Sequence, residues 1–169
     1  MSQKSGRSVI LPKRTVTRSK KKSTLSSCKS VWLRLKPNES GALDRIVIKG
    51  RLIGLNEYVA AERTNRYKAA QIKRDTEELI TLSLIDANEA GTLHSHIHPC
   101  ELWITWVEPN HRRDIDNISF ATKMIQDAMV RAGVFPDDNP KFICLLHHTV
   151  AYDNNNPRVE ITIRERKNR

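Results

Sequence analysis

The sequence predicts a single α/β domain over residues 41–166, with elements in the order β-α-β-α-β-β, preceded by a basic disordered tail over residues 1–40. Three observations carry this prediction. Short apolar, β-branched runs alternate with two long segments of helical periodicity. A chain of 169 residues suffices for one domain with a core and is short for two. The excess positive charge is confined to the N-terminal segment.

The sequence of the first half of the domain predicts one strand followed by one long helix. Residues 46–48 are apolar and β-branched, which is typical of a strand. Residues 57–80 contain no Pro or Gly and carry apolar side chains at helical spacing, so we expect one helix, with Asn56 as its N-cap. Its outer face is either solvated or a DNA contact surface, and carries Arg63, Arg66, Lys68, Lys73 and Arg74.

The second half predicts a strand, a helix and a hairpin. Residues 102–107 lie between two prolines and are almost entirely apolar, as in a buried strand. Residues 118–132 place small and apolar side chains on one helical face, and Gly133 is suited to end that helix. Residues 141–152 and 158–164 are separated by a polar loop and predict a hairpin.

The formal net charge of +10 lies entirely in residues 1–40, which hold eleven Lys and Arg against one acidic residue, Glu39. Such a segment suits a polyanionic partner such as nucleic acid, although it could equally be a solvated extension. Its low content of large apolar side chains predicts disorder. Within it, residues 31–35 form a short apolar patch that either packs on the domain or belongs to the tail.

Three widely separated cysteines argue against a disulfide framework and for a reducing compartment: Cys28, Cys100 and Cys144. No apolar run approaches the roughly 20 residues that span a bilayer. The basic N-terminus lacks the apolar core of a signal peptide. We therefore expect a cytoplasmic protein that has no membrane partner.

Asp114 and Asp116 are candidate ligands of a divalent cation. In an extended segment that leaves a buried strand, both carboxylates would point the same way while Ile115 points into the core. Neighbouring like charges repel unless a cation lies between them, and Mg²⁺ prefers oxygen ligands. Arg112 and Arg113 beside the pair suggest an anionic substrate. Alternatively, the two acids only cap the following helix.

Further charged residues could complete such a site. Lys123 and Asp127 lie opposite the apolar stripe of the second predicted helix, where a lysine could hold a phosphate or stabilise developing charge. Asp137 and Asp138 follow the turn after Gly133, which could bring a third carboxylate back to the pair. Ordinary surface charge and plain turn chemistry are the alternatives.

The central block of the sequence resembles the signature of RusA-type Holliday junction resolvases. The resemblance rests on residues 113–117 (RDIDN), 123–129 (KMIQDAM) and 132–138 (AGVFPDD). Several spacings match at once, including the eleven positions from Asp127 to Asp138. Residues 50–57 and 157–161 resemble the opening and the final strand of that family.

This resemblance implies a small, homodimeric, Mg²⁺-dependent endonuclease that cuts branched DNA, such as four-way junctions, in recombination and repair, and that is often prophage-encoded. Asp114, Asp116 and Asp138 match the metal-binding acids of the family, and Lys123 matches its essential lysine. Lys123 follows Asp116 by seven positions where the best-known member has four, which adds about one helical turn, ~5 Å.

The resulting hypothesis is hydrolysis of a DNA phosphodiester, in which Lys123, with Arg112 or Arg113, grips the phosphate. A catalytically inactive DNA-binding protein of the same fold is the competing class, but it would have no reason to retain the three carboxylates. A nuclease that prefers flaps, forks or single strands is the alternative within the enzyme class.

Two other features have competing interpretations. Phe135 either wedges between bases at a junction or belongs to the core. A zinc site or an ordinary polar segment would explain the alternation of His94, His96, His98 and Cys100.

Overall fold

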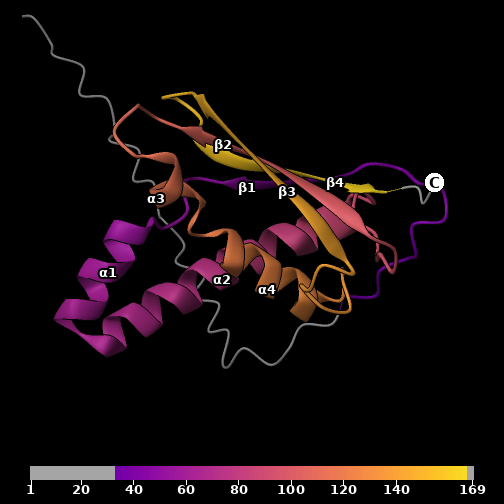
Figure 1. Cartoon of the computed structure of the whole chain (residues 1–169), viewed down its shortest axis with the longest axis horizontal. Coiled ribbons are helices and arrows are strands. Elements are labelled where there is room, and N and C mark those ends of the chain that lie inside the picture. The colour runs from indigo at the N-terminus through magenta and orange to yellow at the C-terminus, as the bar shows by residue number, and fades with distance from the viewer. Residues whose placement is uncertain (1–32, 167–169) are drawn as a thin grey trace, which may run out of the picture.

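The computed structural model describes residues 33–166, and it confirms a single α/β domain (Figure 1). Each of the two predicted helical regions contains two helices instead of one. The elements are β1 (Asp44–Lys49), α1 (Leu55–Thr64), α2 (Arg66–Glu89), β2 (Cys100–Glu108), α3 (Ile115–Ser119), α4 (Thr122–Ala132), β3 (Ile143–Tyr152) and β4 (Arg158–Glu165).

The four strands form one sheet in the order β1-β4-β2-β3. β2 and β3 are parallel and are connected through α3 and α4, whereas β4 runs antiparallel to both β1 and β2. The predicted hairpin between β3 and β4 is therefore wrong, because β2 lies between them. The burial pattern gives the reason: Val159, Ile161 and Ile163 of β4 are buried, as suits a central strand, whereas most of β3 is partly or fully exposed, as suits an edge.

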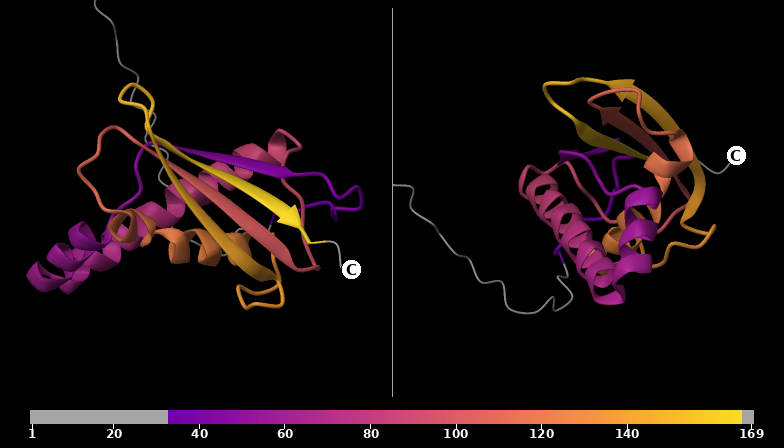
Figure 2. Two further views of the ribbon diagram at one scale, coloured as in Figure 1. Left: turned by 45° about the horizontal axis from the view of Figure 1, so that its top comes forward. Right: turned by 90° about the vertical axis from the view of Figure 1, so that its left-hand side faces the viewer.

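The helices described all lie on one face of the sheet (Figure 2). Inward-facing strand residues such as Ile46 and Ile104 form one core with Leu84 of α2 and Ile125 of α4. On the opposite face, the half-exposed ring of Trp103 stacks on His147, with ring centroids 3.6 Å apart. Within residues 33–166, no helix combines the length and the apolar character that crossing a membrane requires.

A break at Asn65 divides the first helical region, so the prediction of one helix capped by Asn56 is wrong. Asn65 is extended, with φ −162° and ψ 115°, and its side chain accepts a hydrogen bond of 2.8 Å from the backbone N–H of Tyr67. Asparagine is among the best N-cap residues, so it begins a second helix even without Pro or Gly. The N-cap of α1 is Gly54, whose N–H donates to the side chain of Glu57.

The packed chain begins before the predicted domain boundary at residue 41. The N–H of Leu33 donates to the carbonyl of Ala132 at 3.2 Å, and Leu33 and Leu35 pack against the core. Pro37 forms a bridge with Ser95. Residues 33–40 therefore belong to the domain, because their leucines cover its apolar surface. The disordered tail that we predict over residues 1–40 therefore includes packed residues from Leu33 onward, and its residues 1–32 lie outside the described part of the chain.

Candidate active site

Asp114 and Asp116 lie at the start of the short helix α3, not in an extension of β2. Asp114 is the N-cap residue, but its side chain makes no capping hydrogen bond, and Asp116 lies in the first turn. Both side chains are exposed. The prediction that Ile115 points into the core is wrong, since it is 53% exposed. Successive residues of a helix are rotated by about 100° instead of alternating, so the period-2 argument fails here.

A buried ion pair fixes the segment that carries these acids. The guanidinium of Arg113 bonds to Glu108, at the end of β2, at 3.1 Å, and to the carbonyl of Leu52 at 3.3 Å. Both charged side chains are less than a tenth exposed. Arg113 therefore holds the loop before α3, while Arg112 is exposed. Sequence reasoning missed Glu108, whose only signal is an acid at the end of an apolar strand, five residues before an arginine.

The first turn of α3 docks against the start of α1. The side-chain oxygen of the buried Asn117 accepts a hydrogen bond of 3.0 Å from the backbone N–H of Asn56. A β-carbon on Gly54 would collide with the guanidinium of Arg113 and the side chain of Asn117, so any larger residue would force these two side chains to shift. Neither Gly54 nor Asn117 was singled out as a site residue from the sequence, although a glycine directly before a helix is a recognisable signal.

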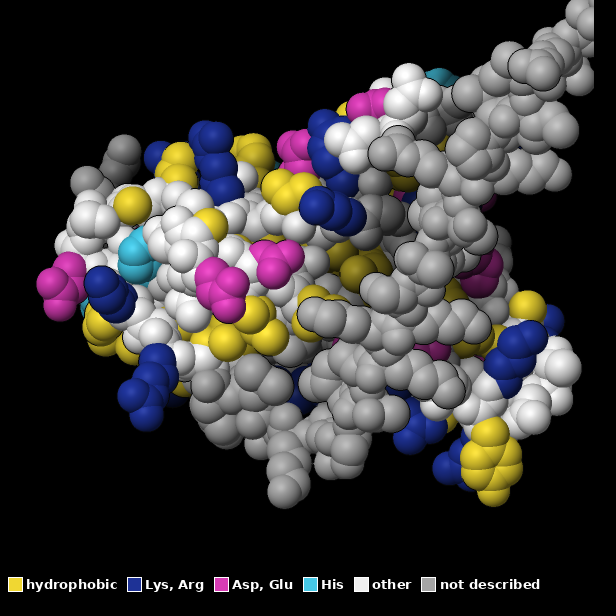
Figure 3. All heavy atoms as spheres, turned by 180° about the vertical axis from the view of Figure 1, so that it is seen from behind, with side chains coloured by type: hydrophobic (Ala, Val, Ile, Leu, Met, Phe, Trp, Pro, Cys, Tyr) yellow, Lys and Arg dark blue, Asp and Glu magenta, His cyan; other side chains and the backbone are white. Residues whose placement is uncertain are grey.

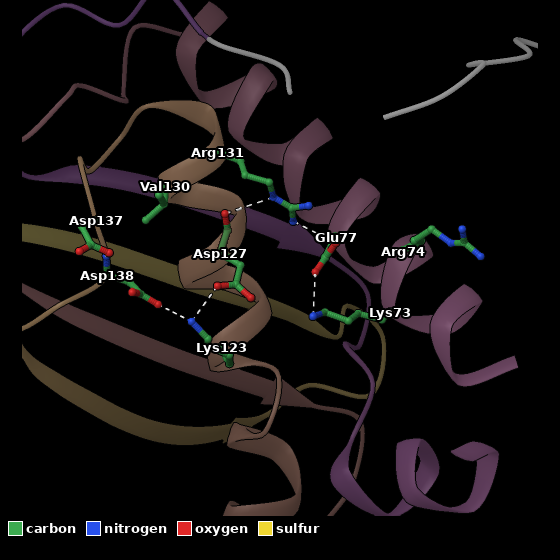
Figure 4. Close-up of a pocket in the computed structure, with 9 residues that line it drawn as sticks. All are labelled: Lys73, Arg74, Glu77, Lys123, Asp127, Val130, Arg131, Asp137 and Asp138. Carbon is green, nitrogen blue, oxygen red and sulfur yellow. Dashed lines mark hydrogen bonds and ion pairs between the residues drawn. The ribbon is translucent and has the colours of Figure 1, made fainter. Parts of the chain in front are cut away.

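Lys123 lies in the first turn of α4 and joins two carboxylates (Figure 4). Its ammonium is 2.8 Å from the nearer oxygen of Asp127 and also bonds to Asp138. The side chain of Lys123 is 65% exposed. The prediction that Lys123 and Asp127 lie on the outer face of the helix is confirmed, and Asp138 comes back to the same place.

The turn after α4 delivers Asp138 to that position. Gly133 adopts φ 83°, a left-handed conformation suited to glycine, and ends the helix as predicted. Val134 and Phe135 are then fully buried, which anchors the reversal of the chain. Phe135 is thus a core residue and not an exposed wedge.

The contacts of Lys123 also set the protonation states at this surface. Hydrogen bonds to Asp127 and Asp138 raise the pKa of Lys123 above its usual value. The hydrogen bond from Lys123 lowers the pKa of Asp138. At neutral pH the ammonium is therefore charged and Asp138 is ionised.

The three predicted metal-binding acids are not gathered around one point in residues 33–166. The residues that bring three potential ligand atoms within 4.8 Å of one another there are His96, Cys100 and Glu165. Asp138 is instead paired with Lys123, and the predicted helix over residues 118–132 is interrupted between α3 and α4. The interruption lies between Asp116 and Lys123, where this sequence has its longer spacing.

His96 is completely buried, and hydrogen bonds to two carboxylates explain why these side chains lie close together. One ring nitrogen lies 3.0 Å from Asp44 and the other 2.9 Å from Glu165. Burial opposes the charged ring, but the bonds to the two carboxylates outweigh it and raise the pKa of His96. Burial raises the pKa of the Cys100 thiol to about 12, so it stays protonated at neutral pH. His94 also bonds to Asp44, at 2.7 Å, and the group is an ion-pair network.

Sequence comparison assigns the family of this α/β domain. The family model described as Endodeoxyribonuclease RusA matches residues 56–164, which is most of the folded region. The chain therefore belongs to the RusA family of endodeoxyribonucleases, which are of the Holliday junction resolvase type. No curated protein sequence matches the chain.

Proposed function

We propose that the protein is a Mg²⁺-dependent endodeoxyribonuclease that cuts four-way junctions or related branched DNA. The observation that carries this proposal is the contact of Lys123 with Asp138 on the surface of the family-matched region. Two residues that the sequence resemblance matches to a metal-binding acid and the essential lysine of the family are fifteen positions apart in the chain and adjacent in space.

The donor chemistry of the proposed site fits magnesium. Asp114, Asp116 and Asp138 offer carboxylate oxygens, which are the ligands that Mg²⁺ prefers. The oxygens of Asp114 make no capping bond, and Asp138 already accepts one cation, the ammonium of Lys123. When bound, a divalent ion would supply an activated water and stabilise the leaving oxygen of the phosphodiester.

Lys123 is placed to bind the scissile phosphate. Its ammonium projects from α4 into solvent and is charged at neutral pH, as lysine ordinarily is, and its carboxylate partners raise its pKa further. A phosphate oxygen can take the place of Asp138 as the second partner of this ammonium, while Asp127 continues to hold it. Charge fixed in this way stabilises negative charge that develops on the phosphate. The exposed Arg112 is a second candidate contact to the backbone.

A homodimer would match the shape of the substrate. A four-way junction has near-twofold symmetry, so a C2 dimer could present one site to each of two opposed strands.

The basic segment over residues 1–40 would add contacts to phosphates. Where described side chains are visible in Figure 3, the basic ones lie singly or in small groups. A role in recombination and repair, a prophage origin and a cytoplasmic location accompany this proposal.

Cleavage of labelled four-way junctions, flaps, forks and linear duplex, with Mg²⁺ or with EDTA, tests the proposal. We expect metal-dependent cutting that favours branched substrates. Asp114→Asn and Asp116→Asn should each abolish cutting but retain junction binding, because removing negative charge does not weaken attraction to DNA. Asp86→Asn, an exposed change far along α2, is the matched control and should cut normally. Full activity in either site variant would remove that residue from the mechanism, and equal cutting of linear duplex would refute branch selectivity.

A further inference from the structure

Two basic residues of α2 share a pocket with the proposed catalytic residues. The pocket has a volume of about 530 Å³ and lies between α2, α4 and the segment after α4 (Figure 4). Its lining includes Lys73, Arg74, Glu77, Lys123, Arg131 and Asp138.

Charges of both signs line this pocket. Lys123 lies with Asp127 and Asp138 at one end, and α2 contributes Lys73, Arg74 and Glu77 at the other (Figure 4). Within the described residues, Arg74 makes no ion pair. The side chain of Lys73 is 46% exposed and lies 3.7 Å from Glu77, too far for a hydrogen bond. Lys73 lies at the pocket beside Glu77, and Arg74 lies at its rim with the guanidinium turned away from Lys123, so that a change of rotamer would bring it to an anion in the pocket (Figure 4).

Glu77 keeps the basic end of the pocket in place. It accepts a contact of 3.0 Å from the guanidinium of Arg131 on α4, and its side chain is only 13% exposed. This pair ties α2 to α4 and neutralises Arg131. The same carboxylate lies beside Lys73, so it directs that ammonium toward the pocket without binding it tightly.

From this arrangement we propose that Lys73 and Arg74 bind a phosphate of the DNA strand next to the scissile phosphate. This inference rests on the proposed function. A strand whose scissile phosphate lies at Lys123 carries one negative charge per nucleotide, and on the α2 side the pocket offers Arg74 and the loosely paired Lys73, 3.7 Å from Glu77. Three other basic residues of the same helical region, Arg63, Arg66 and Lys68, are exposed but do not line the pocket. The pocket thus distinguishes two of the five basic residues as substrate contacts.

The test compares two double variants that each remove two positive charges from α2. One is Lys73→Ala with Arg74→Ala, and the matched control is Arg66→Ala with Lys68→Ala. Binding to a labelled four-way junction is measured in EDTA at several salt concentrations. For the pocket variant, we expect binding about tenfold weaker, and a log–log salt slope shallower by about 1 to 2, as the loss of one or two phosphate contacts requires. The control should bind within about twofold of wild type.

Further measurements separate binding from folding and catalysis. Thermal unfolding should be similar for both double variants, and Arg74→Lys should restore most of the affinity that Arg74→Ala loses, because the charge is retained. With enzyme in excess and DNA fully bound, the single-turnover rate should stay within about threefold of wild type, under ~0.7 kcal/mol of barrier.

Equal weakening in both double variants would overturn the inference, because the effect would then be one of general charge. Unchanged binding in the pocket variant would overturn it as well. The proposed function fails separately, if wild-type protein binds the junction but does not cut it with Mg²⁺. In that case the affinities of the two variants still decide whether the pocket holds DNA. Wild-type protein that binds no DNA would overturn both proposals.

Discussion

Two groups of three side chains in this protein are built alike, with one cation between two carboxylates. They differ in their exposure to water. The surface triad consists of Asp127, Lys123 and Asp138, and the buried triad consists of Asp44, His96 and Glu165. The lysine of the surface triad is 65% exposed, whereas the histidine of the buried triad is completely inaccessible.

Solvent decides what each triad can do. Water screens the surface charges and competes for their hydrogen bonds, so partners there can exchange at little cost. In the buried triad, a charge left without its partner would stay in a low-dielectric interior, which is strongly unfavourable. The surface triad can therefore exchange a carboxylate for a phosphate or a metal ion. The buried triad instead locks β1, the segment before β2 and the end of β4 together.

The largest expected effect separates the triads by stability. His96→Leu removes the ring between the buried Asp44 and Glu165, which is 17% exposed, and leaves Asp44 bonded to His94 alone, so the free energy of unfolding should fall by about 3 kcal/mol. Lys123→Met, the matched change in the surface triad, should cost less than about 1 kcal/mol. Urea denaturation of both variants measures the difference. Similar losses in the two variants would show that exposure does not govern these triads.

A somewhat smaller effect should appear in the rate of cleavage. Here the surface triad should matter, whereas stability should depend mainly on the buried triad. If Lys123 grips the scissile phosphate, Lys123→Met should slow single-turnover cleavage about 100-fold, or ~2.7 kcal/mol of barrier. Lys49→Met, which removes an exposed lysine from β1, is the control and should cut at the wild-type rate. A rate within about threefold of wild type for Lys123→Met, under ~0.7 kcal/mol, would make Lys123 an ordinary surface charge.

Local patterns in the sequence were sufficient to predict much of the fold. The stripe of Ile118, Ala121 and Ile125 predicted a buried helix face, because residues that share such a face are close in sequence. The position of β4 between β1 and β2 could not be predicted in this way, because strand pairing depends on distant partners. The break at Asn65 had a local signal, and the absence of Pro and Gly concealed it.

The same distinction applies to the residues of the proposed site. Asp138 and Lys123 were predicted from the resemblance to the family, although Lys123 departs from the spacing of its best-known member. Asp44 was missed, because its partner His96 lies 52 positions away. Asn117 was missed as a structural contact for the same reason, since it bonds to the backbone of a residue 61 positions away. Residues that support a site through distant contacts leave little trace in the local pattern.

The smallest expected effect is the pH dependence of the buried triad. Burial alone would raise the pKa of Asp44, but its bonds to His96 and His94 lower it below 3.8, and His96 has its pKa raised above 6.5. The contribution of ionised Asp44 to the free energy of unfolding is therefore present above pH 3.8 and is lost as pH falls through its folded pKa. The contribution of protonated His96 is complete below pH 6.5 and is lost as pH rises through its folded pKa.

The difference in unfolding free energy between wild type and His96→Leu should thus be greatest from about pH 4 to 6.5, and should shrink above that range by no more than about 1.4 kcal/mol per pH unit for one titrating group. Urea denaturation of both proteins from pH 4 to 9 measures this difference, and groups outside the triad cancel in it. Lys123→Met should show no comparable change relative to wild type between pH 6 and 8, because Lys123 remains protonated throughout. A difference between wild type and His96→Leu that instead shrinks as pH falls below 6.5 would mean that the histidine is held neutral, and the buried triad would then lack the charge that its surface counterpart carries. A constant difference across the whole range would mean that folding does not shift the pKa of His96.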